Sequence, residues 1–218
     1  MTVLPGRTRF RDRGDAGRAL GELVGRLELV DPVVLALPRG GTPVAAEVAA
    51  AVGGQLDVFV ARKLGLPGQP ELGVGAVAEG AEPLLDRAVL SRLGLSLDDL
   101  AATVEQERAE LARRVAHYRG DRPLPELAGR QVVLVDDGLA TGSTARAALR
   151  ALRRAGPARL VLAVPVCAPG AAQAFEQEAD AVVCVLQPEA FRAVAAWYER
   201  FDQTSDAEVL DLLAVRRR

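Results

Sequence analysis

The sequence predicts an α/β fold of three layers, in which helices cover both faces of a mostly parallel, twisted sheet. Short, continuous apolar runs, typical of strands buried on both faces, alternate along the chain with segments of helical periodicity. Half of the 218 residues are apolar, which is enough to form the core of one domain of this size. No internal repeat or low-complexity linker divides the chain. We therefore expect a single domain over residues 1–218.

The strands are expected where a short apolar run is bounded by turn-forming residues. The clearest run is QVVLVDD, which is rich in valine and ends in two acids. The strands of the main sheet are expected at residues 32–37, 55–61, 131–137, 159–166 and 181–186.

Helices are expected between these strands, and capping residues mark several of their starts. Thr42 precedes Pro43, the arrangement of an N-cap followed by proline at the first helical position. Ser96 and Asp99 resemble a capping box, and Ser205 is expected to cap the last helix. The expected helices cover about residues 15–29, 43–52, 97–118, 143–155 and 169–178, followed by two more near the carboxyl end.

The region after the second strand departs from this alternation. Residues 62–75 are rich in glycine and proline, and we expect them to form a loop. Residues 75–86 are expected to form a hairpin that turns near Gly80. Lys63, in the loop, is the only lysine of the chain, which is otherwise rich in arginine.

Composition and charge argue against several classes of protein. Lys and Arg number 27 and Asp and Glu 29, so a formal charge of −2 gives no case for general nucleic-acid binding. No apolar run approaches the roughly 18 residues needed to cross a bilayer, and the amino end has no hydrophobic signal core. Cys167 and Cys184 lie in apolar runs, as buried structural thiols in a reducing compartment would. We expect a cytoplasmic protein that binds neither nucleic acid nor membrane.

Three loops follow strands of the predicted sheet, and ligands of such sheets bind beyond the carboxyl ends of the strands. These loops are residues 38–41, 62–75 and 136–144. The third is the strongest signal, because Asp136 and Asp137 end a buried strand and a loop of small and hydroxyl-bearing residues leads into a helix. Converging amides and the helix dipole favour a phosphate there, while the carboxylates can accept hydrogen bonds from sugar hydroxyls or face a metal ion. A sugar phosphate is therefore the expected ligand.

Other interpretations of these motifs fit less well. Residues 136–144 lack the lysine of a P-loop and have Ser143 in its place. GVGAVA at residues 73–78 mimics a dinucleotide fingerprint, but prolines precede it and no helix is expected after it. A solvated strand end with a helix cap is the alternative for the acidic pair, and the complete strand–loop–helix unit favours a binding site.

Residues 132–144, VVLVDDGLATGST, resemble the phosphoribosyl diphosphate (PRPP) signature of the type I phosphoribosyltransferase family. In that family two acidic residues follow a hydrophobic strand, and a short loop ends in Thr-Gly-x-Thr. The order of the other elements fits along most of the chain, and the whole sequence is most similar to a poorly characterised bacterial branch of the family. The resemblance implies a phosphoribosyltransferase-like fold with a helical insertion at residues 86–129 and a small hood at residues 187–218.

The resemblance also implies an activity and a cofactor. Members transfer ribose 5-phosphate from PRPP to a nitrogen acceptor, such as a nucleobase or another amine, and release pyrophosphate. Asp136 and Asp137 would hold the ribose hydroxyls and, directly or through water, Mg²⁺. The 5′-phosphate would be bound by Ala140, Thr141, Gly142, Ser143 and Thr144. The pyrophosphate would be bound by Arg39, Gly40, Gly41, Arg62 and Lys63, of which the first three belong to a loop that often contains a cis peptide.

The resemblance leaves the acceptor chemistry open. Hypoxanthine-type members carry an acid where this chain has Ala140, whereas adenine-type members share the alanine and place a glutamate elsewhere. Glu71, in what resembles the mobile loop of the family, is a candidate general acid/base, with a solvated loop charge as the alternative. Trp197 and Phe201 of the hood could stack on a nucleobase, and packing is their alternative role.

Two other functions remain open on the sequence alone. One is a non-catalytic regulator that binds PRPP or a nucleotide, and the other is a hydrolase or phosphorylase acting on another phosphorylated sugar. The insertion is compatible with a lid, a dimer surface or scaffold, and a homodimer would be common for the family.

Overall fold

The computed structural model describes residues 8–66, 69–96 and 98–215, and its centre is a five-stranded sheet. The strand order is β2-β1-β6-β7-β8, and every neighbouring pair is parallel. The predicted fold class is therefore confirmed, and the five predicted strands form the sheet. Their bounds are β1 Val33–Ala36, β2 Gln55–Val58, β6 Gln131–Val135, β7 Arg159–Val166 and β8 Ala181–Leu186.

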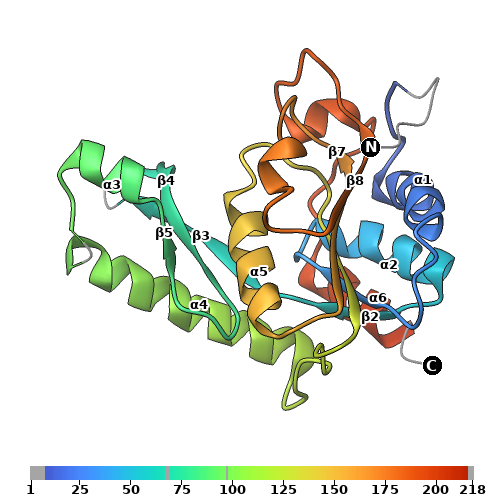
Figure 1. Ribbon diagram of the computed structural model, residues 1–218, viewed down its shortest axis with the longest axis horizontal. Helices are drawn as coiled ribbons and strands as arrows, with labels where there is room; N and C mark the ends of the chain where they lie inside the picture. Colours follow the sequence, from blue (N-terminus) through green and yellow to red (C-terminus); the bar gives the residue numbers. More distant parts are fainter. Residues whose placement is uncertain (1–7, 67–68, 97, 216–218) are drawn as a thin grey trace.

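Helices cover both faces of this sheet (Figure 1). One face packs against α1 (Arg13–Gly25), α2 (Gly41–Val52) and α6 (Asp206–Val215), and the other packs against α5 (Ser143–Arg154). Successive strand residues point to opposite faces, so Val34 contributes to the first core and Val33 to the second. Both valines are fully buried, and such a side chain contributes about 1.5–3 kcal/mol when it leaves water.

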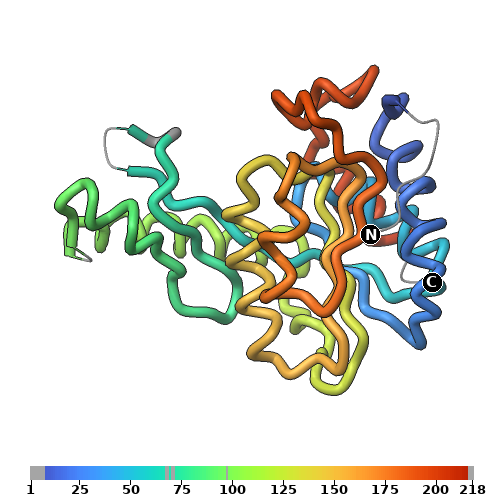
Figure 2. The backbone as a smooth tube through the Cα atoms, turned by 45° about the horizontal axis from the view of Figure 1, so that its top comes forward, coloured from blue at the N-terminus to red at the C-terminus, as the bar shows by residue number. Residues whose placement is uncertain are grey.

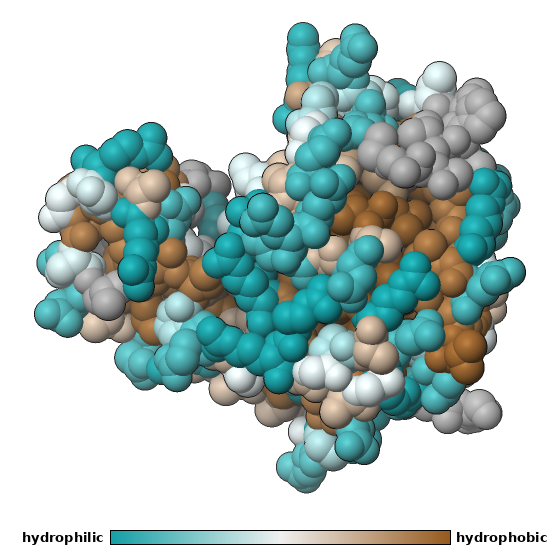
Figure 3. Space-filling model, viewed as in Figure 1, coloured by the Kyte–Doolittle hydropathy of each residue, from teal (hydrophilic) through white to brown (hydrophobic). Residues whose placement is uncertain are grey.

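A second unit, which we call the arm (residues 61–119), projects from the main body (Figure 2). It comprises an antiparallel sheet of β3 (Ala61–Leu66), β4 (Gln69–Ala78) and β5 (Leu84–Leu85), followed by α3 (Arg87–Leu93), the 3₁₀ turn η1 (Asp98–Leu100) and α4 (Ala101–Arg119). Figure 3 shows hydrophobic residues exposed on its surface. The arm has its own small core, formed by Leu64, Val74, Val77, Leu90 and Leu100.

The prediction of a loop at residues 62–75 is wrong, because β3 and β4 pair there as antiparallel strands. The glycines serve close packing rather than a loop, since a Cβ on Gly75 would lie 2.3 Å from the carbonyl oxygen of Leu84. The hairpin at residues 75–86 is confirmed: β4 pairs with β5, and Gly80 has φ +67° in the turn between them.

The helix starts were predicted with mixed success. The Ser96–Asp99 box is present, since the Ser96 amide and hydroxyl both donate to Asp99, and Ser205 accepts from the Glu208 amide at 3.1 Å. Leu97, the expected first residue of that helix, lies outside the described residues. Thr42 is not an N-cap, because α2 begins one residue earlier, at Gly41, and Thr42 is fully buried in its first turn.

Several other predicted bounds also need correction. The first helix ends at Gly25, and the run at residues 55–61 divides between β2 and β3, which belong to different sheets. The helices expected near residues 169–178 and 187–205 shrink to the 3₁₀ turns η2 (Gln173–Phe175) and η3 (Val194–Trp197). A left-handed glycine at 170 and an extended residue at 193 limit these turns. Among the described residues, no helix combines the length and apolar character needed to cross a membrane.

Candidate active site at the edge of the main sheet

The site begins where β1 and β6 end side by side. Ala36 of β1 is the register partner of Val135 of β6, and the Leu37 amide donates to the Val135 carbonyl at 2.9 Å. From this pair the chain turns to β2 on one side and to β7 on the other, so the strand order reverses here. Ligands of open α/β sheets bind at such a point. The loops at residues 38–41 and 136–144 therefore leave the same edge together.

A cavity of about 440 Å³ lies over this edge, between the main sheet and the arm. It brings together residues from all three of the predicted loop regions, and one residue of α4 that the sequence analysis did not single out. The residues that matter most for the chemistry are Gly40, Lys63, Arg114, Asp136, Asp137 and Thr144.

Two glycines allow the loop at residues 38–41 to approach the acidic pair. A Cβ on Gly40 would lie 2.1 Å from Oδ2 of Asp137, and a Cβ on Gly41 would lie 2.8 Å from the carbonyl oxygen of Val135. Neither position tolerates a side chain without displacement. The peptide bond between Pro38 and Arg39 is cis, as the resemblance implies.

Asp137 is held by an ion pair that the sequence did not reveal. Oδ2 of Asp137 accepts from Nε of Arg13 at 2.9 Å and lies 2.8 Å from a terminal nitrogen of the same guanidinium. The guanidinium also donates to the Asp202 carbonyl and lies 3.8 Å from the ring centre of Phe201. The Tyr198 hydroxyl donates to the Asp137 carbonyl at 2.5 Å. The start of α1 and the segment near residue 200 are thus both tied to the acidic pair, and no motif marked Arg13 beforehand.

Burial raises the pKa of Asp136 well above its usual range, and the charge of Asp137 adds to this effect. Burial also raises the pKa of Asp137, although the Arg13 guanidinium opposes the change. Oδ1 of Asp136 accepts from the Asp137 amide at 2.8 Å, which orients the carboxyl group. Hydroxyl donors or a cation placed in the cavity would stabilise the ionised form of this pair.

The loop before α5 forms a site suited to an anion. Gly142 has φ +69°, and a Cβ there would lie 2.5 Å from the Phe175 ring, so the turn requires glycine. Among the described residues, no side chain caps the first turn of α5, which leaves its amides directed out of the helix. Thr141 and Ser143 line a second cavity of about 800 Å³ between α5 and the arm, which Lys63 also lines.

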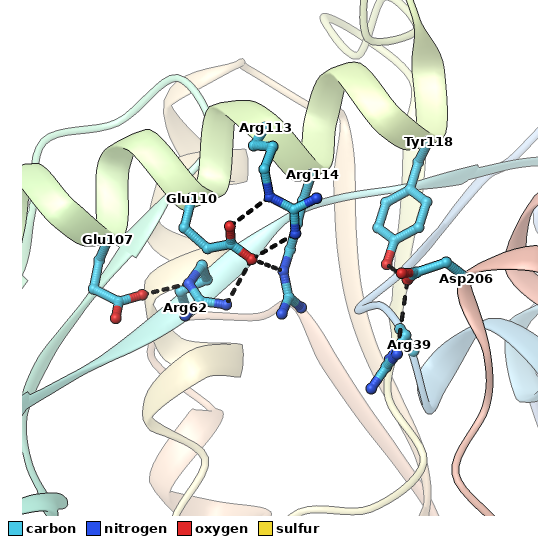
Figure 4. A network of polar contacts seen from close by, with 8 residues as sticks. All are labelled: Arg39, Arg62, Glu107, Glu110, Arg113, Arg114, Tyr118 and Asp206. Atoms are coloured by element: carbon cyan, nitrogen blue, oxygen red, sulfur yellow. Dashed lines mark hydrogen bonds and ion pairs between the residues drawn. The ribbon is translucent and has the colours of Figure 1, made fainter.

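Carboxylates of α4 and α6 neutralise two of the predicted pyrophosphate-binding arginines (Figure 4). Arg62 pairs with Glu107 and lies 3.9 Å from Glu110. Arg39 lies 3.9 Å from Asp206, which accepts a hydrogen bond from the Tyr118 hydroxyl. Arg62 lines the cavity, whereas the side chain of Arg39 is not part of its lining, and the charges of both arginines are partly balanced within the chain.

The remaining candidates lie less clearly in the site. Trp197 packs partly buried against the core, and the structure shows no partner for its indole nitrogen among the described residues. Phe201 lies under Arg13 and against Tyr198, with ring centres 4.9 Å apart. The backbone of Glu71 belongs to β4, but its side chain lies outside the described residues. The base-binding and acid/base roles of these residues stay predictions.

The described residues contain no cluster of three or more His, Cys, Asp or Glu side chains able to hold a metal ion. Mg²⁺ usually keeps several waters and is bound by one or two carboxylates together with substrate phosphates. The adjacent Asp136 and Asp137 carboxyl groups fit that mode of binding and do not fit a cage made of protein ligands alone.

Comparisons with known proteins show which family the chain resembles. Residues 15–200 match the family described as phosphoribosyl transferase domain. The chain is 45% identical over 204 residues to two Mycobacterium tuberculosis proteins, named "Putative phosphoribosyl transferase" MT0597 and Rv0571c. That match covers 94% of this chain and 46% of either relative, so the chain spans about half the length of the curated relatives it matches.

A solved structure is also similar over nearly the whole chain. The crystal structure of TT1426 from Thermus thermophilus superposes with a TM-score of 0.81 at 44% identity, covering 94% of this chain and 97% of that one. The three-layer fold and the arrangement of its sheet are therefore shared with an experimentally determined structure.

Proposed function

The chain belongs to the phosphoribosyl transferase family, and we propose that it transfers ribose 5-phosphate from PRPP to a nitrogen acceptor with release of pyrophosphate. One observation carries the proposal: an acidic pair, an uncapped first turn of a helix and a closely packed glycine loop meet at one edge of the sheet. Each part suits a different portion of PRPP.

In the proposed reaction, the bond between C1 of the ribose and the pyrophosphate oxygen breaks, and C1 forms a bond to the acceptor nitrogen. The pyrophosphate leaves with the electron pair, and a proton leaves the acceptor nitrogen. Positive charge develops at C1 in the transition state. The task of the protein is therefore mainly positioning and electrostatic stabilisation.

The residues divide between the two ends of the donor. The amides and hydroxyls of residues 140–144 would bind the 5′-phosphate at the start of α5, where the helix dipole favours an anion. Asp136 and Asp137 would accept hydrogen bonds from the ribose hydroxyls. Lys63 and the loop at residues 38–41, with Arg39 and Arg62, would bind the leaving pyrophosphate.

We include Mg²⁺ as the cofactor of this reaction. When bound, it would neutralise pyrophosphate oxygens and orient the donor. Asp136 and Asp137 would hold it, directly or through water, and the glycines at 40 and 41 would keep the opposing loop close to them.

The acceptor is the open part of the proposal. Ala140 supplies no acid, so Glu71 remains the candidate that handles the acceptor proton. Trp197 and Phe201 remain candidates for stacking on a nucleobase within a hood at residues 187–218. A homodimer and a cytoplasmic location are also part of the proposal, and the two cysteines, free and buried, are compatible with a reducing compartment.

Calorimetry with PRPP, with and without Mg²⁺, tests the proposal directly. We expect binding that Mg²⁺ strengthens and that Asp137→Asn weakens, whereas Asp211→Asn, an exposed acid of α6, leaves it unchanged. Absence of binding at millimolar PRPP would reject the proposal. A mass-spectrometric screen of nucleobases and amines then identifies the acceptor, and tight PRPP binding with no turnover would favour the non-catalytic regulator.

A further inference from the structure

Arg114 of α4 lines the same cavity as the acidic pair and Lys63. It belongs to residues 86–129, for which the sequence left a lid, a dimer surface or scaffold open. Its side chain is 29% exposed, so most of it is enclosed between α4 and the site. Arg114 therefore connects α4 with the binding site. A helix that served only as scaffold would not require a cation at this position.

The position of Arg114 is fixed by the packing of α4. Leu111 and Val115 of the same helix pack against the cores, and Tyr118 is buried one turn further on. These apolar residues hold one face of α4 against the arm and the main body. Because the helix cannot rotate, the side chain of residue 114 is directed toward the cavity.

A carboxylate then orients the guanidinium. Nε of Arg114 donates to Glu110, one turn earlier in α4, at 2.8 Å (Figure 4). Hydrogen bonds from Arg113 and Arg114 lower the pKa of Glu110 to about 2, so it stays ionised at neutral pH. For the two terminal nitrogens of Arg114, the described part of the chain shows no hydrogen-bonding partner. Their N–H donors can therefore bind a ligand.

The charges around this position leave an excess of cations. Four arginines, Arg39, Arg62, Arg113 and Arg114, face three carboxylates among the described residues, Glu107, Glu110 and Asp206, and Lys63 lines the cavity beside them. The acidic pair on the opposite wall would repel a diphosphate, so cations on this wall are needed to attract one. A guanidinium offers the forked donors that phosphate oxygens accept best.

We propose that Arg114 is a further substrate-binding residue, which donates hydrogen bonds from α4 to the diphosphate group of the donor or to released pyrophosphate. This inference rests on the proposed function, because it assigns a contact within the same site. It makes residues 101–119 a wall of the site rather than a remote scaffold.

The neighbouring arginine provides a matched control. Arg113 pairs with the same Glu110, at 2.6 Å, but its side chain is 63% exposed and it does not line the cavity. Replacing either arginine removes one positive charge from the same turn of the same helix. Only Arg114→Ala removes a donor that faces the cavity.

The test measures binding of two probes by calorimetry, with Mg²⁺ present: inorganic pyrophosphate and ribose 5-phosphate. We expect Arg114→Ala to weaken pyrophosphate binding about ten- to a hundredfold, the loss typical of a charge-assisted hydrogen bond. Ribose 5-phosphate binding should stay within about twofold, and Arg113→Ala should change neither probe beyond that range. Arg114→Lys should recover part of the loss. If Arg114→Ala does not fold, Arg114→Gln carries the same expectation.

Equal loss of pyrophosphate binding in the Arg113 and Arg114 variants would overturn the inference, since it would indicate a general effect of charge. Unchanged pyrophosphate binding in Arg114→Ala would also overturn it, while the proposed function would stand. A wild-type protein that binds neither probe nor PRPP would contradict both.

Discussion

The two walls of the cavity are built in different ways. The wall from the main sheet is set by the backbone, since strand register and closely packed glycines place Asp136 and Asp137. The wall from the arm consists of long cationic side chains, and salt bridges orient those of Arg62 and Arg114. Among the described residues, the arm rests on a core of five buried apolar side chains, whereas the main sheet is buried between two large cores.

This contrast suggests a division of labour in ligand binding. A wall set by the backbone can recognise a sugar phosphate whose shape does not change, because its atoms have little freedom to move. Long cationic side chains can adjust to a diphosphate that first belongs to the donor and then leaves. We therefore expect substitutions that displace the backbone of the sheet wall to abolish binding, and substitutions of single side chains in either wall to weaken it by degrees.

The largest effect is expected from Gly40→Ala. The added Cβ would overlap Oδ2 of Asp137 and force the loop and the acidic pair apart. PRPP affinity measured by calorimetry should fall more than about a hundredfold, which corresponds to about 3 kcal/mol.

Two further glycines control for this result. In the arm, the Cβ added by Gly73→Ala would meet only the flexible side chain of Lys63, at 3.3 Å. This substitution should lower PRPP affinity about tenfold or less. Gly25→Ala at the end of α1 has open space and should leave binding unchanged. Equal effects at Gly40 and Gly73 would remove the distinction between the two walls.

Arg13→Ala should give the next largest effect. The side chains of Arg13 and Asp137 are 11% and 16% exposed, so removing the arginine leaves a mostly buried carboxylate without its partner. We expect the free energy of unfolding to fall by about 2–3 kcal/mol, somewhat less than for a fully buried pair. Chemical denaturation at pH 7 measures this, with Arg18→Ala, an exposed ion pair on the same helix, as the control.

The double variant Arg13→Ala/Asp137→Asn sharpens the interpretation of that loss. If the loss comes from the unpaired charge, the second substitution should restore part of the stability. If the double variant is as unstable as Arg13→Ala alone, the contacts of Arg13 with Asp202 and Phe201 carry the effect instead.

The same contrast explains what the sequence could predict. The strands of the main sheet and the loop at residues 136–144 carry their signal locally, as a valine-rich run, two acids and a helix start. The roles of Arg13 and Arg114 depend on segments more than 20 residues from the acidic pair in the chain, so no local pattern could distinguish them among many arginines. The pairing of β3 with β4 was missed because the glycines typical of a loop serve here in closely packed strands.

Smaller effects are expected from Asp136→Asn, which should raise the stability of the protein but weaken ligand binding. Burial holds the pKa of Asp136 above its ordinary value of 3.8, so the folded protein binds a proton more readily than the unfolded chain does. The contribution of Asp136 to stability is therefore greatest below pH 3.8 and is lost as pH rises through the pKa of the folded state. Asparagine removes that loss and can still accept the Asp137 amide hydrogen bond.

We expect Asp136→Asn to stabilise the ligand-free protein at pH 7 by about 1–2 kcal/mol and to weaken ribose 5-phosphate binding about tenfold. Denaturation at about pH 5 and about pH 8 should show a smaller difference between the two pH values in the variant than in the wild type. A variant that is less stable than the wild type at the higher pH would mean that the carboxylate is stabilised by its surroundings.

The smallest effects are expected when two capping serines are removed, one in the main body and one in the arm. Ser205 caps α6 in the main body, and Ser96 with Asp99 caps the 3₁₀ turn η1, which leads into α4 of the arm. Ser205→Ala should lower the free energy of global unfolding by about 1 kcal/mol. Ser96→Ala should instead increase hydrogen exchange of amides in residues 101–119 and leave the global transition nearly unchanged, because a unit with a small core opens on its own. If Ser96→Ala lowers the global transition as much as Ser205→Ala does, the arm and the main body unfold as one unit, and the two walls of the cavity share one stability.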